Sequence, residues 1–219
     1  MTDGILLIDK PVGMTSFGVV ARVRRVLSEQ QNKKVKVGHT GTLDPFATGL
    51  MIIVVGKECK NAGTYSKLDK VYEATIRLGQ TSTTGDTEGE ITEVSSVVPS
   101  KQQIEDILGQ FCGEITQRPP IYSAININGQ RAYKLARKGV EVTMPTRQVM
   151  IHSLELINYT YPEINIRVHV GSGTYIRTLA EDIGSALGVG AYCNKLRRIA
   201  INDTSIDSAI KLEDLGINS

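Results

Sequence analysis

One short segment combines a restricted backbone with a single carboxylate. Residues 38–49 read GHTGTLDPFATG and contain three glycines, one proline and the side chain of Asp44. Loops held on a rigid scaffold often carry catalytic groups, and an ionised carboxylate can act as a nucleophile. An Asp-Pro dipeptide also commonly begins a simple turn, so both interpretations stay open from these residues alone. An aspartate-nucleophile phosphotransferase is disfavoured, because the loop lacks the second acid that would help to hold magnesium.

The familiar cofactor and metal motifs are missing from the sequence. Gly171-Ser172-Gly173 would begin a dinucleotide fingerprint, but the sixth position is Ile176 rather than glycine or alanine. No GxxxxGK[ST], HExxH or GxSxG segment occurs, and the three histidines have no companion cysteine pair. The three cysteines lie far apart, which excludes a disulfide framework. None of these patterns therefore indicates a metal or cofactor site.

The charged residues are unevenly distributed, although the net charge is only +2. Basic residues concentrate in residues 22–36, 131–147 and 195–198, whereas acids concentrate in residues 86–106. Separate basic stretches in a nearly neutral chain are typical of a surface that follows a phosphate backbone. Each stretch alone could equally be the solvated face of a helix, so nucleic-acid binding is a hypothesis at this point.

Strand and helix patterns alternate on both sides of the candidate loop. Before it, the patterns predict a strand at Ile5–Ile8 and a helix capped by Thr15 or Ser16, with apolar positions Phe17, Val20, Val23 and Leu27. After it, they predict strands at Leu50–Val55, Tyr72–Leu78 and Ile164–Val170, a helix from the Ser100–Gln103 capping box to Gly113, a hairpin turn at Asn128-Gly129, and a helix at Thr174–Leu187.

Strands interleaved with helices, and joined in places by hairpins, predict an α+β fold with a mixed sheet and helices packed on it. The length of 219 residues suits one domain, and residues 119–147 could form an inserted arm. The longest apolar run, Leu50–Val55, is far shorter than the ~20 residues of a membrane span. Residues 1–4 do not resemble a signal peptide, so we expect a soluble, cytoplasmic protein.

Several segments resemble, in order, the motifs of the TruB family of tRNA pseudouridine synthases, and most closely its stand-alone bacterial branch. These segments are GILLIDKPVGMTS at 4–16, GHTGTLDPFATG at 38–49, KVYEATIRLGQTSTTGDTEG at 70–89, RPPIYSAININGQRAYKLARKGVEV at 118–142, GTYIRTLAEDIG at 173–184 and KLRR at 195–198. The resemblance implies a largely antiparallel central sheet flanked by helices. It also implies a single catalytic domain over residues 1–219, with the insertion at about 119–147 and no C-terminal PUA-type domain.

The resemblance implies conversion of the uridine at position 55, in the TΨC loop of tRNA, to pseudouridine without a cofactor or metal. It assigns Asp44 as the nucleophile, Arg177 as the partner of that carboxylate, and Tyr175 as the group that assists proton removal from carbon 5. Tyr72 would stack on the flipped uracil, and His39 would fill the space left by the displaced nucleotide. Whether the nucleophile attacks the base or the ribose stays open.

The resemblance also implies substrate contacts beyond the reacting groups. These are Leu196 as an apolar wall of the pocket, Lys10 beside it, Arg197 and Arg198 near phosphates, and Arg131, Lys134, Arg137 and Lys138 in the insertion. The expected partner is the TΨC stem-loop of tRNA, with no membrane, no obligatory protein partner and a monomeric chain. A competing interpretation is an RNA-binding module or tRNA-folding chaperone without turnover, since the basic insertion would serve either. Retention of Asp44, His39, Tyr72, Tyr175 and Arg177 together favours the enzyme, because a pure binder has little use for a carboxylate facing RNA.

Overall fold

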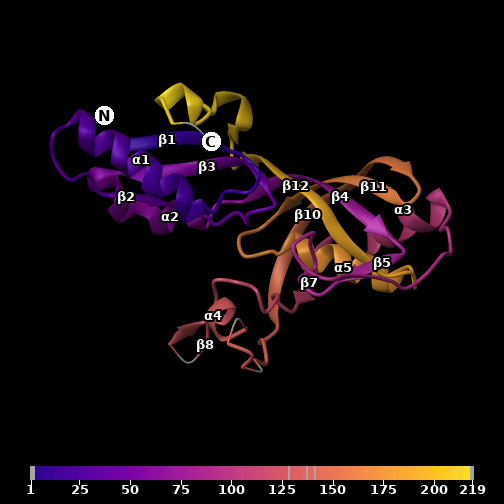
Figure 1. The fold of residues 1–219 in the computed structure, drawn as a ribbon. Coiled ribbons are helices and arrows are strands. Elements are labelled where there is room, and N and C mark those ends of the chain that lie inside the picture. The colour runs from indigo at the N-terminus through magenta and orange to yellow at the C-terminus, as the bar shows by residue number, and fades with distance from the viewer. Residues whose placement is uncertain (1–2, 128, 137, 141, 218–219) are drawn as a thin grey trace. The chain divides into compact units, whose positions relative to one another are not determined.

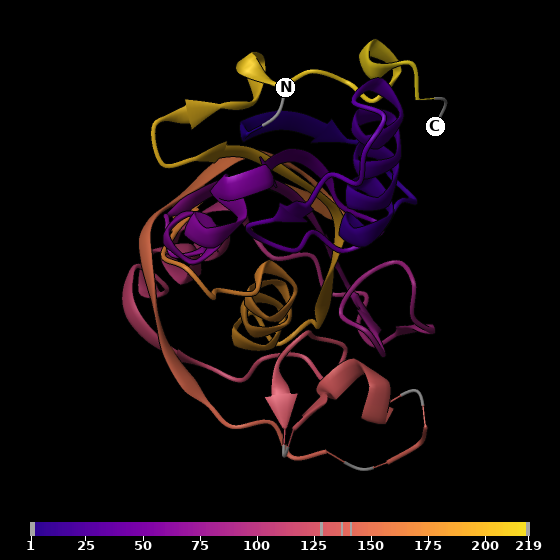
Figure 2. The ribbon, with the colours of Figure 1, turned by 90° about the vertical axis from the view of Figure 1, so that its left-hand side faces the viewer.

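The computed structural model, drawn in Figures 1 and 2, describes residues 3–127, 129–136, 138–140 and 142–217. The chain divides into two compact units. The first unit comprises Met1–Glu73 and Leu196–Ser219, and the second comprises Ala74–Lys195. Two strands, β4 (Lys70–Leu78) and β12 (Ala191–Ile201), contribute residues to both units. The elements form the predicted α+β fold, with a mixed and mostly antiparallel sheet.

The strand β3 (Thr48–Val55) is central to the sheet of the first unit. It pairs along its length with β1 (Gly4–Lys10) and at its end with β2 (Val37–His39), both antiparallel. The last part of β12 runs parallel to the beginning of β3. Every residue of β3 after Thr48 is buried, which confirms the predicted buried strand.

The helix α1 (Ser16–Gln30) begins where the sequence predicts, because the Thr15 hydroxyl accepts a hydrogen bond from the Gly18 amide. Its buried face consists of Ser16, Val19, Val20, Val23 and Leu27. The expectation that Phe17 belongs to this face is wrong, since its side chain is 65% exposed. Each residue turns a helix by about 100°, so Phe17, which follows the buried Ser16, lies beyond the edge of this face although it is only three residues before Val20.

Short elements complete the first unit. They are η1 (Gly56–Asn61), α2 (Ala62–Ser66), β13 (Thr204–Ser205), η2 (Ile206–Ser208) and η3 (Glu213–Leu215). The segment after β13 returns to the edge strand β1 (Figure 1), where the Ile210 amide donates to the Leu7 carbonyl at 3.0 Å. This contact ties the last part of the chain to its first strand.

The second unit contains a sheet in the order β12-β4-β11-β10-β7. Its further strands are β7 (Gly113–Gln117), β10 (Arg147–Thr160) and β11 (Glu163–Val170), with a separate pair formed by β5 (Gln80–Ser82) and β6 (Ile91–Glu93). Alternate residues of β11, from Ile164 to Val170, are buried as the sequence predicts. The strand β10 pairs antiparallel with both β11 and β7.

Two helices accompany this sheet. The helix α3 (Lys101–Gln110) has the predicted capping box, in which Ser100 and Gln103 each bond to the backbone of the other. The helix α5 (Ile176–Ala186) begins later than the predicted Thr174, because Tyr175 is still extended at φ −104° and ψ 116°. Tyr175 is therefore the cap of α5 rather than a residue within it.

The insertion contains a small hairpin and one short helix. They are β8 (Asn126–Ile127), β9 (Gln130–Arg131) and α4 (Ala132–Ala136). Ile127 pairs with Gln130, so the hairpin is confirmed, although Asn128 of the predicted turn lies outside the described residues. Within the described part of the chain, no helix is both long and apolar enough to cross a membrane.

Candidate active site

The Asp44 loop of the first unit connects β2 to β3 and is clamped on both sides of the carboxylate. The buried Ser16 hydroxyl donates to the Leu43 carbonyl at 2.9 Å and accepts from the Leu43 amide at 2.8 Å. On the other side, the Gly13 amide donates to the Pro45 carbonyl at 2.8 Å. The residues next to Asp44 are thus fixed by the beginning of α1 and by the turn that precedes it.

Lys10 is fully buried beneath the same loop. Its ammonium donates to the carbonyl oxygens of Pro11, Met14 and Pro45, at 2.8, 2.7 and 3.3 Å. Burying a cation costs free energy unless it has hydrogen-bond partners, and these three bonds offset the desolvation of the ammonium group. The structure therefore gives Lys10, predicted as a substrate contact, a direct part in holding the loop.

The two arginines of β12 have different surroundings. Arg198 is buried, and it donates to the Leu50 carbonyl at 2.7 Å and to the Gly41 carbonyl at 3.3 Å. Arg197 is partly exposed and forms a bidentate ion pair with Asp9, at 2.7 and 3.1 Å. Both arginines were predicted to lie near phosphates. In the structure Arg198 instead donates a hydrogen bond to the backbone of the Asp44 loop, at Gly41.

Three further predicted residues belong to the first unit. His39 ends β2, and burial, followed by the positive charge of Arg198, lowers the pKa of its imidazole. The ring is therefore neutral at neutral pH, in keeping with a role in filling space rather than in carrying charge. Tyr72 on β4 and Leu196 on β12 are each only 8% exposed.

In the second unit, Tyr175 is held by a side chain that the sequence did not single out. Gln117, which is buried at the end of β7, accepts a hydrogen bond from the Tyr175 amide at 2.7 Å. The same side chain donates to the Tyr175 carbonyl at 3.0 Å. The guanidinium of Arg147 lies over the tyrosine ring, 5.0 Å from its centroid.

Arg177 follows on the first turn of α5 and is 3% exposed. Its Nη1 lies 3.3 Å from the Asp86 carboxylate and donates to the Thr84 carbonyl at 2.8 Å, while Nη2 donates to the Tyr122 carbonyl at 2.9 Å. Asp86 is equally buried. A buried ion pair requires such additional hydrogen bonds to offset the desolvation of both charges.

Asp86 is a residue that sequence reasoning missed. It was counted only within an acidic stretch, and nothing in its spacing connects it to Arg177, which lies more than ninety residues away. The Thr84 hydroxyl and the Glu88 amide both donate to its Oδ1, at 2.6 and 2.9 Å. Its carboxylate is therefore fixed from both sides.

A pocket of about 510 Å³ lies between α5 and the segments that lead into and out of the insertion. Its wall includes Glu181 and Asp182 of α5, together with Arg118 and Met144 from the two ends of the insertion. Burial, and then the charge of Asp182, raises the pKa of Glu181 to about 7. This carboxyl group consequently changes its charge near neutral pH.

The basic residues predicted in the insertion are exposed where the structure describes them. Arg131 donates to the Ala124 carbonyl, and Lys134 and Lys138 lie at the surface. Arg137, also predicted, lies outside the described residues. The described side chains are accessible to a partner of opposite charge.

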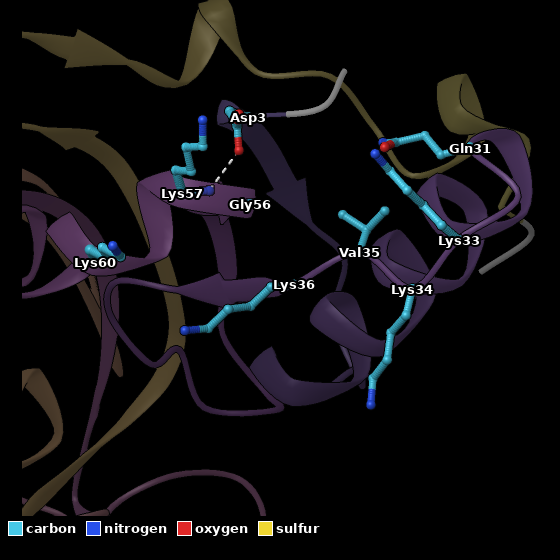
Figure 3. A pocket seen from close by; sticks show the side chains of 9 residues that line it. All are labelled: Asp3, Gln31, Lys33, Lys34, Val35, Lys36, Gly56, Lys57 and Lys60. Carbon is cyan, nitrogen blue, oxygen red and sulfur yellow. Dashed lines mark hydrogen bonds between the residues drawn. The ribbon is translucent and has the colours of Figure 1, made fainter.

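A second basic surface, here called the lysine pocket, belongs to the first unit (Figure 3). It encloses about 340 Å³ and carries five exposed lysines, which are Lys33, Lys34, Lys36, Lys57 and Lys60. The antiparallel pairing of β2 with β3 brings the two lysine-bearing segments together, since Val37 lies opposite Val55. The Gly56 amide then donates to the Lys36 carbonyl at 2.8 Å. Sequence reasoning included the first three lysines in a basic stretch and missed Lys57 and Lys60.

Figure 3 shows these lysine side chains spreading outward in different directions around Val35. A site for one phosphate needs donors that converge on a point, whereas separated ammonium groups suit several phosphates along a strand. The carboxylate of Asp3 at the rim accepts a hydrogen bond from the Lys57 amide at 2.6 Å. Among the described residues, none of the five lysines has an ion pair with a carboxylate.

Comparison with known proteins identifies the family. Residues 24–176 match the model of the TruB family pseudouridylate synthase N-terminal domain, and residues 177–217 match that of the tRNA pseudouridylate synthase B C-terminal domain. A tRNA pseudouridine synthase B of Azoarcus sp. (strain BH72) is 45% identical over 98% of this chain and 70% of its own length. The protein of the same name from Clostridium acetobutylicum is 42% identical over 97% of this chain and 72% of its own length.

Two solved structures have the same fold. A crystal structure of a Cbf5-Nop10-Gar1 complex superposes with a TM-score of 0.74 and 31% identity, covering 96% of this chain and 53% of that chain. An H/ACA RNP bound to a substrate RNA containing 2'-deoxyuridine gives a TM-score of 0.71 and 28% identity, covering 96% and 51%. This chain therefore spans about half the length of those solved chains. The matches in sequence and fold show that the chain belongs to the TruB family of pseudouridylate synthases, which are isomerases.

Proposed function

We propose that this chain converts the uridine at position 55, in the TΨC loop of tRNA, to pseudouridine, with Asp44 as the nucleophile. The observation that carries this assignment is the position of Asp44 between Leu43 and Pro45. The backbone of Leu43 is hydrogen-bonded to the Ser16 hydroxyl, and the Pro45 carbonyl accepts from the Gly13 amide. The curated relatives named tRNA pseudouridine synthase B support tRNA as the substrate. The TΨC position and the role of Asp44 follow from the family resemblance of the GHTGTLDPFATG segment.

The reaction is an isomerisation and needs no net redox change. The bond between ribose and N1 of uracil breaks, the base turns, and a bond forms between the ribose and carbon 5. The proton lost from carbon 5 is balanced by one gained at N1, so substrate and product have the same atoms. Asp44 must be ionised to attack, and the carboxylate leaves again when the new bond forms. Attack on the base and attack on the ribose both satisfy this balance.

The target base must first leave the RNA stack, which costs a few kcal/mol. We assign Tyr72 to stacking on the flipped uracil, a contact worth about 1–3 kcal/mol. The neutral His39 would occupy the space that the nucleotide leaves, and Leu196 would form an apolar wall of the pocket. Tyr175 would assist removal of the proton from carbon 5.

Arg177 is suited to orient a carboxylate because its own position is already fixed. Asp86 and two backbone carbonyls hold the guanidinium before any substrate arrives. A planar, permanently charged guanidinium group that is already held in place needs little reorientation during the reaction. We propose that it orients the ionised carboxylate of Asp44.

The exposed basic surfaces would bind the RNA backbone. Arg131, Lys134, Arg137 and Lys138 of the insertion are proposed to grip the folded arm, and the lysine pocket to contact phosphates elsewhere on the tRNA. The partly exposed Arg197 would add to this charge, and Arg198 would act from beneath the loop that it braces. We further propose that the chain acts as a cytoplasmic monomer without an obligatory protein partner.

The test is incubation of unmodified tRNA with the wild-type chain and with the variants Asp44→Asn and Asp203→Asn, followed by pseudouridine mapping. Asp203 is an exposed acid of the first unit and serves as the matched control. We expect product at one uridine of the TΨC loop with wild type and control, and none with Asp44→Asn. Product formed by Asp44→Asn would overturn the nucleophile assignment. RNA binding without product from the wild-type chain would favour a tRNA-folding chaperone.

A further inference from the structure

Gln117 and Arg147 face one another in the second unit and both contact Tyr175. Gln117 is the last residue of β7, Arg147 is the first residue of β10, and the two are register partners in the antiparallel pair. Their side chains thus leave the end of the sheet together. By sequence, Arg147 is only the last residue of the basic stretch 131–147, and Gln117 has no predicted role. Neither residue belongs to α5, which begins beside Tyr175.

The Gln117 side chain acts on the backbone of Tyr175. One amide group accepts from the Tyr175 N–H at 2.7 Å and donates to the Tyr175 C=O at 3.0 Å. This is the pattern of a neighbouring strand in a ladder, supplied here by a side chain that is 1% exposed. It also determines the orientation of the amide, since only Oε1 can accept and only Nε2 can donate. The bonds fix φ and ψ of Tyr175 and hence the direction in which its ring leaves the backbone.

The Arg147 side chain acts on the ring. Its guanidinium carbon lies 5.0 Å from the ring centroid, within the usual range of a cation–π contact. Gly173 leaves room for this group, because a Cβ at that position would lie 3.3–3.4 Å from three guanidinium atoms. The cation is therefore enclosed between the tyrosine ring and the backbone of Gly173.

Two nitrogens of this guanidinium, Nε and Nη2, are buried without a hydrogen-bond partner in the described structure. Buried donors that stay unsatisfied reduce stability, and such groups in native proteins call for an explanation. No carboxylate among the described residues forms an ion pair with Arg147, so its planar face against the tyrosine is its main polar contact. The guanidinium is thus placed against the tyrosine ring and the backbone of Gly173 rather than against a carboxylate, an arrangement suited to holding the ring in one orientation.

We propose that Gln117 and Arg147 are positioning residues that preset Tyr175 for its part in the reaction, Gln117 through the backbone and Arg147 through the ring. This inference rests on the role assigned to Tyr175 in the proposed function. A misplacement of about 1 Å in a reacting group can lower turnover about 100-fold, whereas RNA affinity depends mainly on phosphate contacts elsewhere. The pair should therefore affect kcat and leave KM nearly unchanged.

The experiment measures kcat and KM on unmodified tRNA for Gln117→Glu, Arg147→Met and Arg147→Lys, with Gln148→Glu as the matched control. Gln148 is the exposed neighbour of Arg147 on β10. We expect kcat to fall about 10- to 100-fold for Gln117→Glu and Arg147→Met, with KM within about twofold of wild type. Arg147→Lys keeps a cation near the ring and should recover part of the loss. A rise in KM with unchanged kcat would show that Arg147 contacts the RNA instead, and would overturn the inference.

A double-mutant cycle with Tyr175→Phe separates this inference from the proposed function. If Arg147 acts through Tyr175, then Arg147→Met added to Tyr175→Phe should lower the single-turnover rate by less than about twofold. If the effects of Arg147→Met and Tyr175→Phe on the rate are fully additive, the positioning role of Arg147 is contradicted, while the proposed function is not. A Tyr175→Phe variant as fast as wild type would instead contradict the role of Tyr175. Thermal unfolding of each variant excludes loss of the fold as the cause, and if Arg147→Met unfolds, the kcat and KM of the Gln117→Glu variant decide.

Discussion

The Asp44 loop and the insertion differ in how firmly the protein holds their functional side chains. Around Asp44, a buried hydroxyl, a buried ammonium and a buried guanidinium each bond to loop backbone, through Ser16, Lys10 and Arg198. In the insertion, Lys134 and Lys138 are exposed, and Arg131 has one carbonyl partner within its own hairpin region. Chemistry needs a reacting group preset in place, whereas binding a phosphate backbone tolerates movement. This difference is the one expected if the Asp44 loop carries the reacting group and the insertion binds RNA, as proposed above.

The two largest losses of stability, similar in size, are expected from Gly49→Ala and Asp86→Asn, and Gly49→Ala tests how tightly the Asp44 loop is held. Gly49 has φ +110°, and a Cβ there would lie 2.7 Å from the backbone nitrogen of Arg198 and closer still to the backbone carbonyl oxygen of the same residue. We expect a loss of stability of about 3 kcal/mol or more, because both the dihedral and the contact oppose the side chain.

The matched control is Gly13→Ala, which also has positive φ but meets nothing within 4 Å. It should lose only about 1–2 kcal/mol. Urea denaturation compares the two variants. Equal losses would show that close packing against Arg198 is not what restrains the loop.

The second of these changes concerns Asp86, which forms a buried ion pair with Arg177 in the second unit. Asp86→Asn keeps the shape of the side chain but removes the buried negative charge that lies 3.3 Å from Nη1 of Arg177, at a cost of about 3–5 kcal/mol. We also expect kcat to fall, because the guanidinium loses its preset orientation. Denaturation and steady-state kinetics on tRNA measure both effects.

Glu163→Gln is the control for this prediction. It removes the ion pair between Arg77 and Glu163, whose atoms lie 3.8 Å apart and whose side chains are about one-third exposed. Such a pair contributes at most about 1 kcal/mol. If Asp86→Asn and Glu163→Gln lose the same stability, burial does not make the Asp86–Arg177 ion pair more important to the fold than an exposed pair.

The pH dependence of stability gives a further test, through Glu181. Its pKa is raised to about 7, so the folded chain holds this proton where an unfolded glutamate has lost it. The sign follows directly, since stability from this group is fully present below about pH 4.5 and declines as pH rises to about 7. Glu181→Gln should therefore raise stability above pH 7, by about 1–2 kcal/mol after allowance for solvent screening.

Melting curves from pH 4.5 to 8 measure this difference against an exposed control, Glu213→Gln. The lowered pKa of His39 acts in the opposite direction below about pH 6.5, and the comparison between variants cancels it. A wild-type curve that stays parallel to the Glu181→Gln curve would show that the carboxyl does not titrate in this window.

The smallest effects per residue are expected from the exposed basic surfaces. Changing Arg131, Lys134 and Lys138 to glutamine should weaken binding of both full tRNA and the isolated TΨC stem-loop, with the fold intact. Changing the five lysines of the lysine pocket should weaken binding of full tRNA only. For every phosphate that a variant no longer binds, the slope of log K against log salt should decrease by about 0.7–0.9. Equal slopes for the variants and the wild type would contradict both placements.

Local patterns in the sequence were sufficient for some elements, but they did not predict the sheet strands β7, β10 and β12. The capping box of α3, the alternation of β11 and the buried run of β3 all occur in the structure as predicted. Two further errors concern local geometry, because Phe17 lies outside the buried face of α1 and Tyr175 lies before α5 rather than within it. Apolar spacing alone does not show whether the buried face of α1 includes Val19 or Phe17, because both residues are apolar and lie two positions apart.

The sequence by itself determined the family, the residue types of the candidate site and the segments that carry them, because these depend on short motifs. Only the tertiary structure decided which groups support them. Asp86 reaches Arg177, Gln117 reaches Tyr175, and the lysines at 33–36 join those at 57–60 through strand pairing. Burial, which sets the pKa of His39 and Glu181, is likewise a property of the packed chain. Contacts between distant segments arise from packing that no local spacing encodes, and for that reason the supporting groups were found only in the fold.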